Sequence, residues 1–152
     1  MKEYRTGTKD VVLPYNWALG QTWSRFFEAL KEEKILGTRC RSCLKVLVPA
    51  RSFCPGCYRD MEEWVEVGQE GSVETWCLVN YRYLGQTLEP PYIIAQIRLD
   101  GASCGFTHLV GGFDLTRPDE VRQRMRRGMR VRAVWREEKR GDIHDIAHFR
   151  PL

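Results

Sequence analysis

The chain has 152 residues, a length that supports one compact domain with a small appendage, or two very small domains that need a cross-link such as a bound metal ion for stability. Hydrophobic residues make up 43% and charged residues 29%, proportions that predict a folded globular protein. Lys and Arg total 24 against 20 Asp and Glu, and this net charge of +4 is too small to indicate a polyanionic partner by itself. No apolar run approaches the length of a signal or membrane-spanning segment, so we expect a soluble cytoplasmic protein without a membrane partner.

The N-terminal part, residues 1–37, is predicted to form a loose arm followed by an amphipathic helix over residues 22–34. Thr22 or Ser24 is the candidate N-cap, and Gly37 is the candidate stop signal. Apolar side chains recur at the i, i+3, i+4 and i+7 positions of this helix, namely Trp23, Phe26, Phe27 and Leu30. This aromatic stripe either packs on the chain's own domains or docks on another subunit.

Four cysteines dominate the next segment, residues 38–62. Cys40 and Cys43 are separated by two residues, and so are Cys54 and Cys57, so each pair can wrap one tight turn around a metal ion. Four thiolates fill a tetrahedral shell and leave no open position for water, which favours a structural zinc over a catalytic one. Iron bound as in rubredoxin is the alternative. Five cationic residues lie close to the cysteines along the chain and are expected to surround the site: Arg39, Arg41, Lys45, Arg51 and Arg59.

From Trp64 onward the hydrophobic period changes to two, which is typical of strands. We expect strands at residues 44–48, 64–67, 72–81, 92–99, 103–110 and 130–136, with another at 143–149 and a short helical turn within 118–127. Short strands of varied length over residues 63–152 favour a small closed barrel, and the OB-fold is the natural candidate. The predicted fold is therefore mainly β, with a helical arm, a rubredoxin-like zinc ribbon and a C-terminal barrel.

The order of these parts resembles a known family. The similar parts are a helix, the segments Gly37 to Cys43 and Phe53 to Cys57, the strand at Trp64, and the segments Gly71-Ser72-Val73 and Gly128-Met129-Arg130-Val131. In these parts the chain is similar to the rubredoxin-like zinc ribbon plus OB-fold proteins, the domain of unknown function thirty-five family. The resemblance covers residues 23–135. Its specific part is the combination, because zinc ribbons and barrels occur separately in many unrelated proteins.

The resemblance implies a non-catalytic accessory subunit with one structural Zn²⁺, assembled as a hetero-oligomer with a thiolase-like or hydratase-like enzyme that acts on acyl-CoA thioesters. The catalytic cysteine and histidines would lie on that partner, and this chain would help to assemble or gate the acyl-CoA site. The small size and aromatic arm also resemble the small subunits of benzoylsuccinyl-CoA thiolases.

Other polar residues offer weaker candidates for chemistry. Cys77 and Cys104 lie in apolar strand sequence and are predicted to be packed thiols, although His108 follows Cys104 by four residues as a candidate base. His144 and His148 share one face and have acidic neighbours, a pattern that allows a second metal site but is more typical of surface residues. No catalytic triad or phosphate-binding glycine loop is present in the sequence.

Six arginines fall within residues 122–132, and Arg126, Arg127 and Arg130 are candidates to contact the phosphates of coenzyme A. The simpler interpretation is a solvated loop and the outer face of a strand, next to an acidic partner surface. A different class of function is a single-stranded nucleic-acid-binding module, with bases stacked on Trp76, Tyr81 or Tyr83. The modest net charge makes nucleic acid the less favoured partner.

Overall fold

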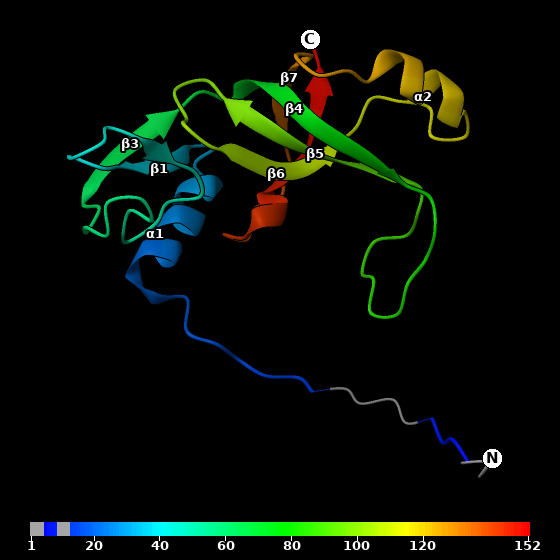
Figure 1. Cartoon of the computed structure of the whole chain (residues 1–152), viewed down its shortest axis with the longest axis horizontal. Helices are drawn as coiled ribbons and strands as arrows, with labels where there is room; N and C mark the ends of the chain where they lie inside the picture. The colour runs from blue at the N-terminus through cyan, green and yellow to red at the C-terminus, as the bar shows by residue number, and fades with distance from the viewer. Residues whose placement is uncertain (1–4, 9–12) are drawn as a thin grey trace, which may run out of the picture.

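A computed structural model describes residues 5–8 and 13–152. Within the predicted arm, residues 1–4 and 9–12 lie outside the described part. Helix α1 (Gly20–Lys31) precedes a three-stranded antiparallel sheet in the order β2-β1-β3, formed by β1 (Ile35–Arg39), β2 (Val46–Leu47) and β3 (Glu63–Val67). Figure 1 shows this sheet and α1 at one end of the molecule, with the barrel beside them. Strand β1 spans positions 37 and 38, and β3 begins at Glu63. The two strands pair antiparallel, with Ile35 opposite Val67 and Arg39 opposite Glu63.

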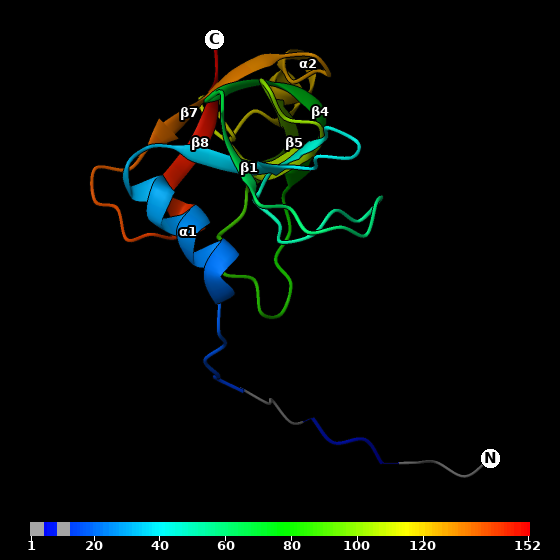
Figure 2. The ribbon, with the colours of Figure 1, turned by 90° about the vertical axis from the view of Figure 1, so that its left-hand side faces the viewer.

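The remaining strands close into a barrel. Its order is β4-β5-β6-β8-β7, with β4 paired back to β7. The elements are β4 (Glu70–Val79), β5 (Tyr92–Leu99), β6 (Gly105–Val110), α2 (Pro118–Arg124), β7 (Arg130–Trp135), the 3-10 turn η1 (Ile143–Asp145) and β8 (Ile146–Pro151). Figure 2 shows the ring of strands nearly end on. Five strands closed in this order, with β6 and β8 parallel, form an OB barrel, so the predicted fold class is confirmed.

Helix α1 begins and ends earlier than the sequence predicts. The Ser24 hydroxyl donates to the Gly20 carbonyl at 2.7 Å, so it bonds within the helix and does not cap it, and Leu19 occupies the N-cap without a side-chain bond. The helix ends at Lys31, and Glu33, two residues later, has a φ of 59° in the left-handed region. The N–H groups of Glu33 and Lys34 donate to Leu30 and Ala29 carbonyls, which completes the helix end before Gly37 is reached.

Two strands also differ in extent. The sequence predicts a strand over residues 44–48, but β2 comprises only Val46–Leu47 because Leu44 has a φ of 60° and turns the chain. The predicted last strand starts later, since residues 143–145 form η1 and β8 continues to Pro151.

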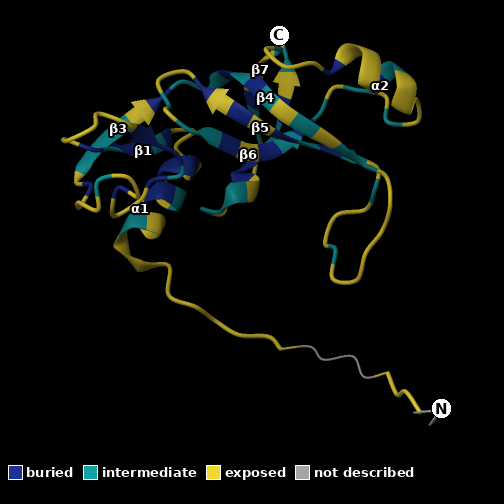
Figure 3. Ribbon diagram, viewed as in Figure 1, coloured by how far each residue is buried: buried dark blue, intermediate teal, exposed yellow. Residues whose placement is uncertain are grey.

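The core runs through both parts of the molecule. Buried side chains from α1 and the ribbon, including Phe26, Leu30 and Ile35, belong to the same packed cluster as barrel residues such as Ile97 and Phe149. Figure 3 shows buried segments meeting where α1 and the ribbon sheet approach the barrel. A hydrogen-bonded link joins them as well, because the Ser103 N–H donates to the Val46 carbonyl at 2.8 Å and the Ser103 hydroxyl accepts from the Val46 N–H at 3.0 Å. Ribbon, helix and barrel thus share one core.

Across residues 5–8 and 13–152, every helix is too short or too polar to traverse a lipid bilayer.

Candidate metal centre and partner surfaces

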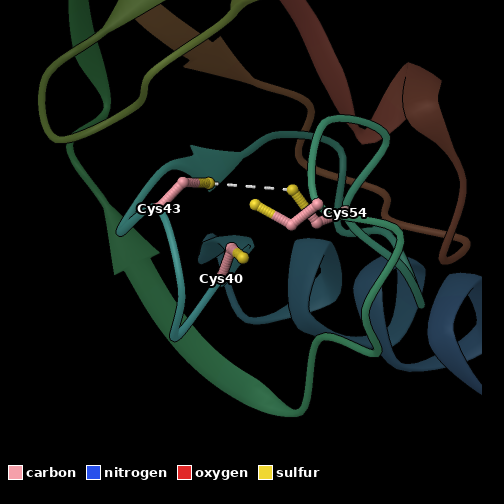
Figure 4. A group of neighbouring side chains, drawn as sticks. Cys40, Cys43 and Cys54 are labelled. Carbon is pink, nitrogen blue, oxygen red and sulfur yellow. Dashed lines mark hydrogen bonds between the residues drawn. The ribbon is translucent and has the colours of Figure 1, made fainter.

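Two similar turns bring the four cysteines together. In the first, the Leu44 N–H donates to the Cys40 carbonyl and the Cys40 N–H donates to the Lys45 carbonyl. In the second, Tyr58 and Arg59 make the same two bonds with Cys54, all at 2.8–2.9 Å. The four sulfur atoms lie within 4.8 Å of one another, and Cys43 Sγ lies 3.7 Å from Cys54 Sγ. Figure 4 shows the sulfurs of Cys40, Cys43 and Cys54 facing a common centre, the arrangement that a tetrahedral metal ion requires.

The local electrostatics favour thiolate at Cys40 and thiol at Cys57. Backbone N–H groups of Cys43 and Ser42 donate to the Cys40 sulfur and lower the pKa of that thiol to about 6. Hydrogen bonding to Cys43, together with burial, raises the pKa of Cys57 to about 12. Without a metal, Cys40 therefore ionises more readily than Cys57. A divalent ion would replace the remaining protons, because thiolate rather than thiol is the metal ligand.

The centre is closed toward the protein. Cys40 and Cys54 are almost completely buried. The Thr38 hydroxyl, also buried, donates to the Arg51 carbonyl and accepts from the Arg51 N–H, which fixes the second turn against β1. Cys43 is exposed and Cys57 is partly buried. The full set of four sulfur ligands is what is typical of a structural site and not of a catalytic one.

Equivalent positions in the two turns hold strained residues. Leu44 comes directly after Cys43, and Tyr58 comes directly after Cys57. Their φ values are 60° and 53°. Left-handed backbone costs a side-chain-bearing residue about 1 kcal/mol relative to the right-handed form. Both side chains are nevertheless large and exposed, Leu44 at 69% and Tyr58 at 84%.

The structure separates Cys104 from the candidate base His108. The Cys104 sulfur donates to the Val48 carbonyl and accepts from the Val48 N–H, beside the four-cysteine cluster. His108 is buried and its Nε2 lies 3.2 Å from the Ile143 carbonyl, to which it donates. The two side chains have different backbone partners, so Cys104 is a packed thiol as the sequence predicts. The same prediction is wrong for Cys77, which is exposed on β4 because its side chain faces away from the barrel core.

The second metal site suggested by His144 and His148 does not form. Within the part of the chain that the structure describes, the four cysteines are the only group of three or more His, Cys, Asp or Glu placed to share an ion. Asp145 is buried and accepts from the N–H groups of Arg140 and Gly141, while Asp142 accepts from the His144 N–H. The acidic residues therefore organise the turn before β8.

Only part of the aromatic stripe on α1 faces solvent. Phe26 and Leu30 are buried in the core, and Phe27 packs partly against it. Trp23 is 40% exposed and stands edge-on between Phe27 and Trp17, with ring centroids 5.8 and 5.6 Å away. Further apolar side chains before the helix are exposed: Leu13, Tyr15, Trp17 and Leu19. The exposed aromatic surface therefore extends from Trp23 toward the N-terminus, a signal that the helical period alone misses.

The arginine-rich segment is divided between paired and unpaired side chains. Arg130 forms a two-pronged ion pair with Asp100 and also contacts Glu70, which Arg132 contacts too. These pairs lower the pKa values of Asp100 and Glu70. Arg126 and Arg130 line a surface cavity of about 610 Å³ near the C-terminus, and Arg126 and Arg127 are exposed. Arg130 is thus occupied by carboxylates, which leaves Arg126 and Arg127 as the candidates for phosphate contact.

A cavity of about 620 Å³ lies between the β4–β5 loop and the β7–β8 loop. In OB-folds these two loops flank the usual site for oligonucleotides. Here four carboxylates line the cavity, from Glu137, Glu138, Asp142 and Asp145, against the cations Arg136 and Arg140. Tyr81 and Tyr83 are exposed on the β4–β5 loop, whereas Trp76 is half-buried in β4. The charge of this cavity does not favour a phosphate backbone.

Comparison with known proteins shows which domain families the ribbon and the barrel match. Residues 27–62 match the family model for the ChsH2 rubredoxin-like zinc ribbon domain, and residues 64–136 match that for the ChsH2 C-terminal OB-fold domain. A DUF35 domain-containing scaffold protein of Methanocaldococcus jannaschii is 31% identical over 123 residues, which cover 78% of this chain and 82% of that protein. The chain belongs to the DUF35 family.

Other similar proteins include a relative and a solved structure whose names refer to enzymes. A probable enoyl-CoA hydratase alpha subunit of Thermomonospora curvata is 27% identical over 110 residues, 72% of this chain; the match spans about a third of that longer protein, 34%. A DUF35 structure from Sulfolobus solfataricus shares the fold, with a TM-score of 0.62 and 23% identity over 88% of this chain and 87% of that one. An Ltp2-ChsH2(DUF35) aldolase structure matches with a TM-score of 0.64 and 25% identity, over 90% of this chain and 98% of that chain. The family is associated with enzymes of acyl-CoA metabolism.

Proposed function

We propose that this DUF35 protein is a non-catalytic, zinc-binding accessory subunit that assembles with a thiolase-like enzyme acting on acyl-CoA thioesters. The observation that carries the proposal is the likeness to the ChsH2(DUF35) chain of an aldolase over nearly the full length of both chains. A scaffold protein and a hydratase subunit among the relatives support the same class of role. The small subunit of a benzoylsuccinyl-CoA thiolase is the finer assignment that the size and aromatic arm suggest.

The metal in this proposal is one structural Zn²⁺, held by Cys40, Cys43, Cys54 and Cys57. The donor set supports it, because four sulfurs within 4.8 Å of one another suit a tetrahedral ion and the ribbon family is named for zinc. Bound zinc supplies no reaction chemistry here. It holds the two turns together, and through β1 and β2 it holds the ribbon against α1 and the barrel.

Docking would use the exposed part of the aromatic surface. Trp17 and Trp23 expose 62% and 40% of their surface, next to the exposed Leu13, Tyr15 and Leu19. A continuous exposed apolar surface is a candidate for protein contact. Arg126 and Arg127 are proposed to reach coenzyme A at the completed site, because both are exposed and no carboxylate pairs with them within the described residues. Phe26 and Leu30 serve the core in this arrangement.

The test is a tagged pull-down from the native host, with partners identified by mass spectrometry and metal measured on the same sample. A thiolase-like protein in stoichiometric amount and about one zinc per chain are expected. The Trp23→Asp variant should lose the partner but keep the barrel's far-UV spectrum, whereas Arg122→Asp on α2 is a matched surface control that should retain it. Recovery of nucleic-acid complexes sensitive to nuclease and salt, with no enzyme subunit, would contradict the proposal.

A further inference from the structure

The outer ends of the two cysteine turns have the same design. Each turn ends in a left-handed residue followed by a cation: Leu44 and Lys45 in the first, Tyr58 and Arg59 in the second. We call these four residues the knuckle tips. Glycine adopts left-handed backbone at no steric cost, so a chain selected only to bind zinc would be easiest to fold with glycine at positions 44 and 58. Strain of this kind, kept at two equivalent exposed positions, points to a role for the side chains themselves.

The knuckle tips and their neighbours also concentrate unpaired positive charge. Across the described ranges, Arg41, Lys45 and Arg59 have no carboxylate within ion-pair distance, whereas barrel arginines such as Arg98 and Arg130 do. Arg41, Tyr58 and Arg59 line a common surface cavity of about 450 Å³ beside Cys40, in which Asp60 is the only acidic side chain. Among the described residues, the ribbon therefore carries a group of unpaired cations beside exposed apolar side chains, in addition to the unpaired Arg126 and Arg127 of the barrel.

Stabilising the metal centre does not account for this charge. Backbone N–H groups of Ser42 and Cys43 are the donors to the Cys40 sulfur. Arg41, Lys45 and Arg59 are all exposed, and no bond from their side chains to a sulfur is formed. Solvent-facing cations of this kind affect a thiolate little, since water screens them.

We infer that the knuckle tips are a docking surface for an acidic patch on the partner enzyme subunit. This inference rests on the proposed function, and it adds a second contact apart from the aromatic surface at Trp23. The occupant follows from charge complementarity: exposed apolar side chains sit among unpaired cations, the pattern of a protein interface with an apolar centre and a charged rim. Nucleic acid fits less well, because Tyr58 is the one knuckle tip with a ring for a base to stack on and three cations form no extended track for phosphates.

Charge reversal tests the cations. With the purified partner subunit, K45E/R59E should weaken binding by at least about tenfold at low salt and flatten its dependence on salt. The control is R117E/R122E, which makes the same change in net charge at the N-cap and within α2, at the opposite end of the molecule (Figure 1). It should bind within about twofold of the wild type, because distant charges are screened. Equal loss in both variants would mean that net charge alone acts, and would overturn the inference.

Glycine substitution tests the apolar side chains and separates docking from folding. Leu44→Gly and Tyr58→Gly relieve the left-handed strain, so zinc content should stay the same and the melting temperature should stay equal or rise. Affinity for the partner should nevertheless fall about fivefold. Unchanged affinity would overturn the role of the side chains, and a lower melting temperature would show that they serve the ribbon's own packing.

A measurement on the free protein distinguishes this inference from the proposed function. Poly-L-glutamate should bind the wild type and bind K45E/R59E at least about tenfold more weakly, whether or not an enzyme partner exists. If the wild type captures no enzyme subunit, the proposed function fails while this result still stands. If the subunit is captured equally by the wild type and K45E/R59E, the function stands and the inference fails. Tighter binding of single-stranded oligo-dT than of poly-L-glutamate would overturn the inference, because it would indicate that the knuckle tips bind nucleic acid and not an acidic protein surface.

Discussion

His108 is the buried histidine of the barrel, and its surroundings set its charge state. Its ring stacks on Phe106 and meets Phe149 edge-on, its Nε2 donates to the Ile143 carbonyl, and its Nδ1 has no partner among the described residues. Burial is the largest cause that lowers the pKa of this side chain, helped slightly by the charges of His144 and His148. The folded protein therefore holds His108 neutral.

This predicts a loss of stability in mild acid. The unfolded chain takes up a proton at His108 as pH falls below about 6.5, whereas the folded chain resists protonation, so the free energy of unfolding decreases as pH falls below that value. His108→Leu removes the titration, and its urea midpoint should fall less than that of the wild type between pH 7.5 and 5.5.

The comparison needs two controls, because His148 also has a pKa lowered by burial and zinc ligands can take up protons. His148→Gln reports the first effect, and zinc measured at both pH values reports the second. Parallel pH dependence in the wild type and His108→Leu would contradict the assignment.

At the scale of elements, β1 passes unusually close to β2 and to Val48 at Gly37. A Cβ at this position would lie 2.8 Å from the Leu47 carbonyl oxygen and 2.9 Å from a Val48 methyl carbon. The glycine thus lets β1 approach the chain that leads out of β2, next to the first cysteine turn. Its sequence neighbours suggest a helix stop, but its structural role is this close contact in a sheet.

Gly37→Ala should destabilise the protein by about 1–3 kcal/mol, because the backbone must shift to admit a methyl group. Gly56→Ala is the matched control, since a Cβ there meets nothing within 4 Å and the residue lies in the same ribbon. Urea denaturation of both zinc-loaded variants measures the difference. Equal stability of the two alanine variants would show that the ribbon tolerates the methyl group at position 37.

For the molecule as a whole, the shared core makes ribbon and barrel depend on each other. Phe26 and Leu30 of α1, Val46 of the ribbon and Phe149 of the barrel belong to one cluster, and Ser103 bonds the barrel hairpin to Val46. A change in the ribbon must therefore disturb contacts that the barrel uses. Zinc binding should stabilise the whole chain, not the ribbon alone.

Removing zinc with a strong chelator should lower the melting temperature by at least about 10 °C and keep a single calorimetric transition. Adding zinc back should restore the original value, which controls for damage by the treatment. Cys40→Ser should behave like the chelated protein and should not respond to zinc. Two separate transitions, with the barrel melting at its original temperature, would instead show that the ribbon unfolds independently.

The sequence by itself determined what depends on local pattern. Two pairs of cysteines with two-residue gaps define a ribbon because that spacing suits a turn around a metal, and the period-two segments define the barrel strands because alternate residues face the core. Only the tertiary structure decided which residues are free for partners. Phe26 and Arg130 look like their neighbours Trp23 and Arg126 in the sequence, yet one is buried in the core and the other is held by Asp100, a residue distant along the chain. The burial of a side chain and its ion pairs depend on contacts between segments that are distant along the chain. The local sequence pattern does not specify those contacts.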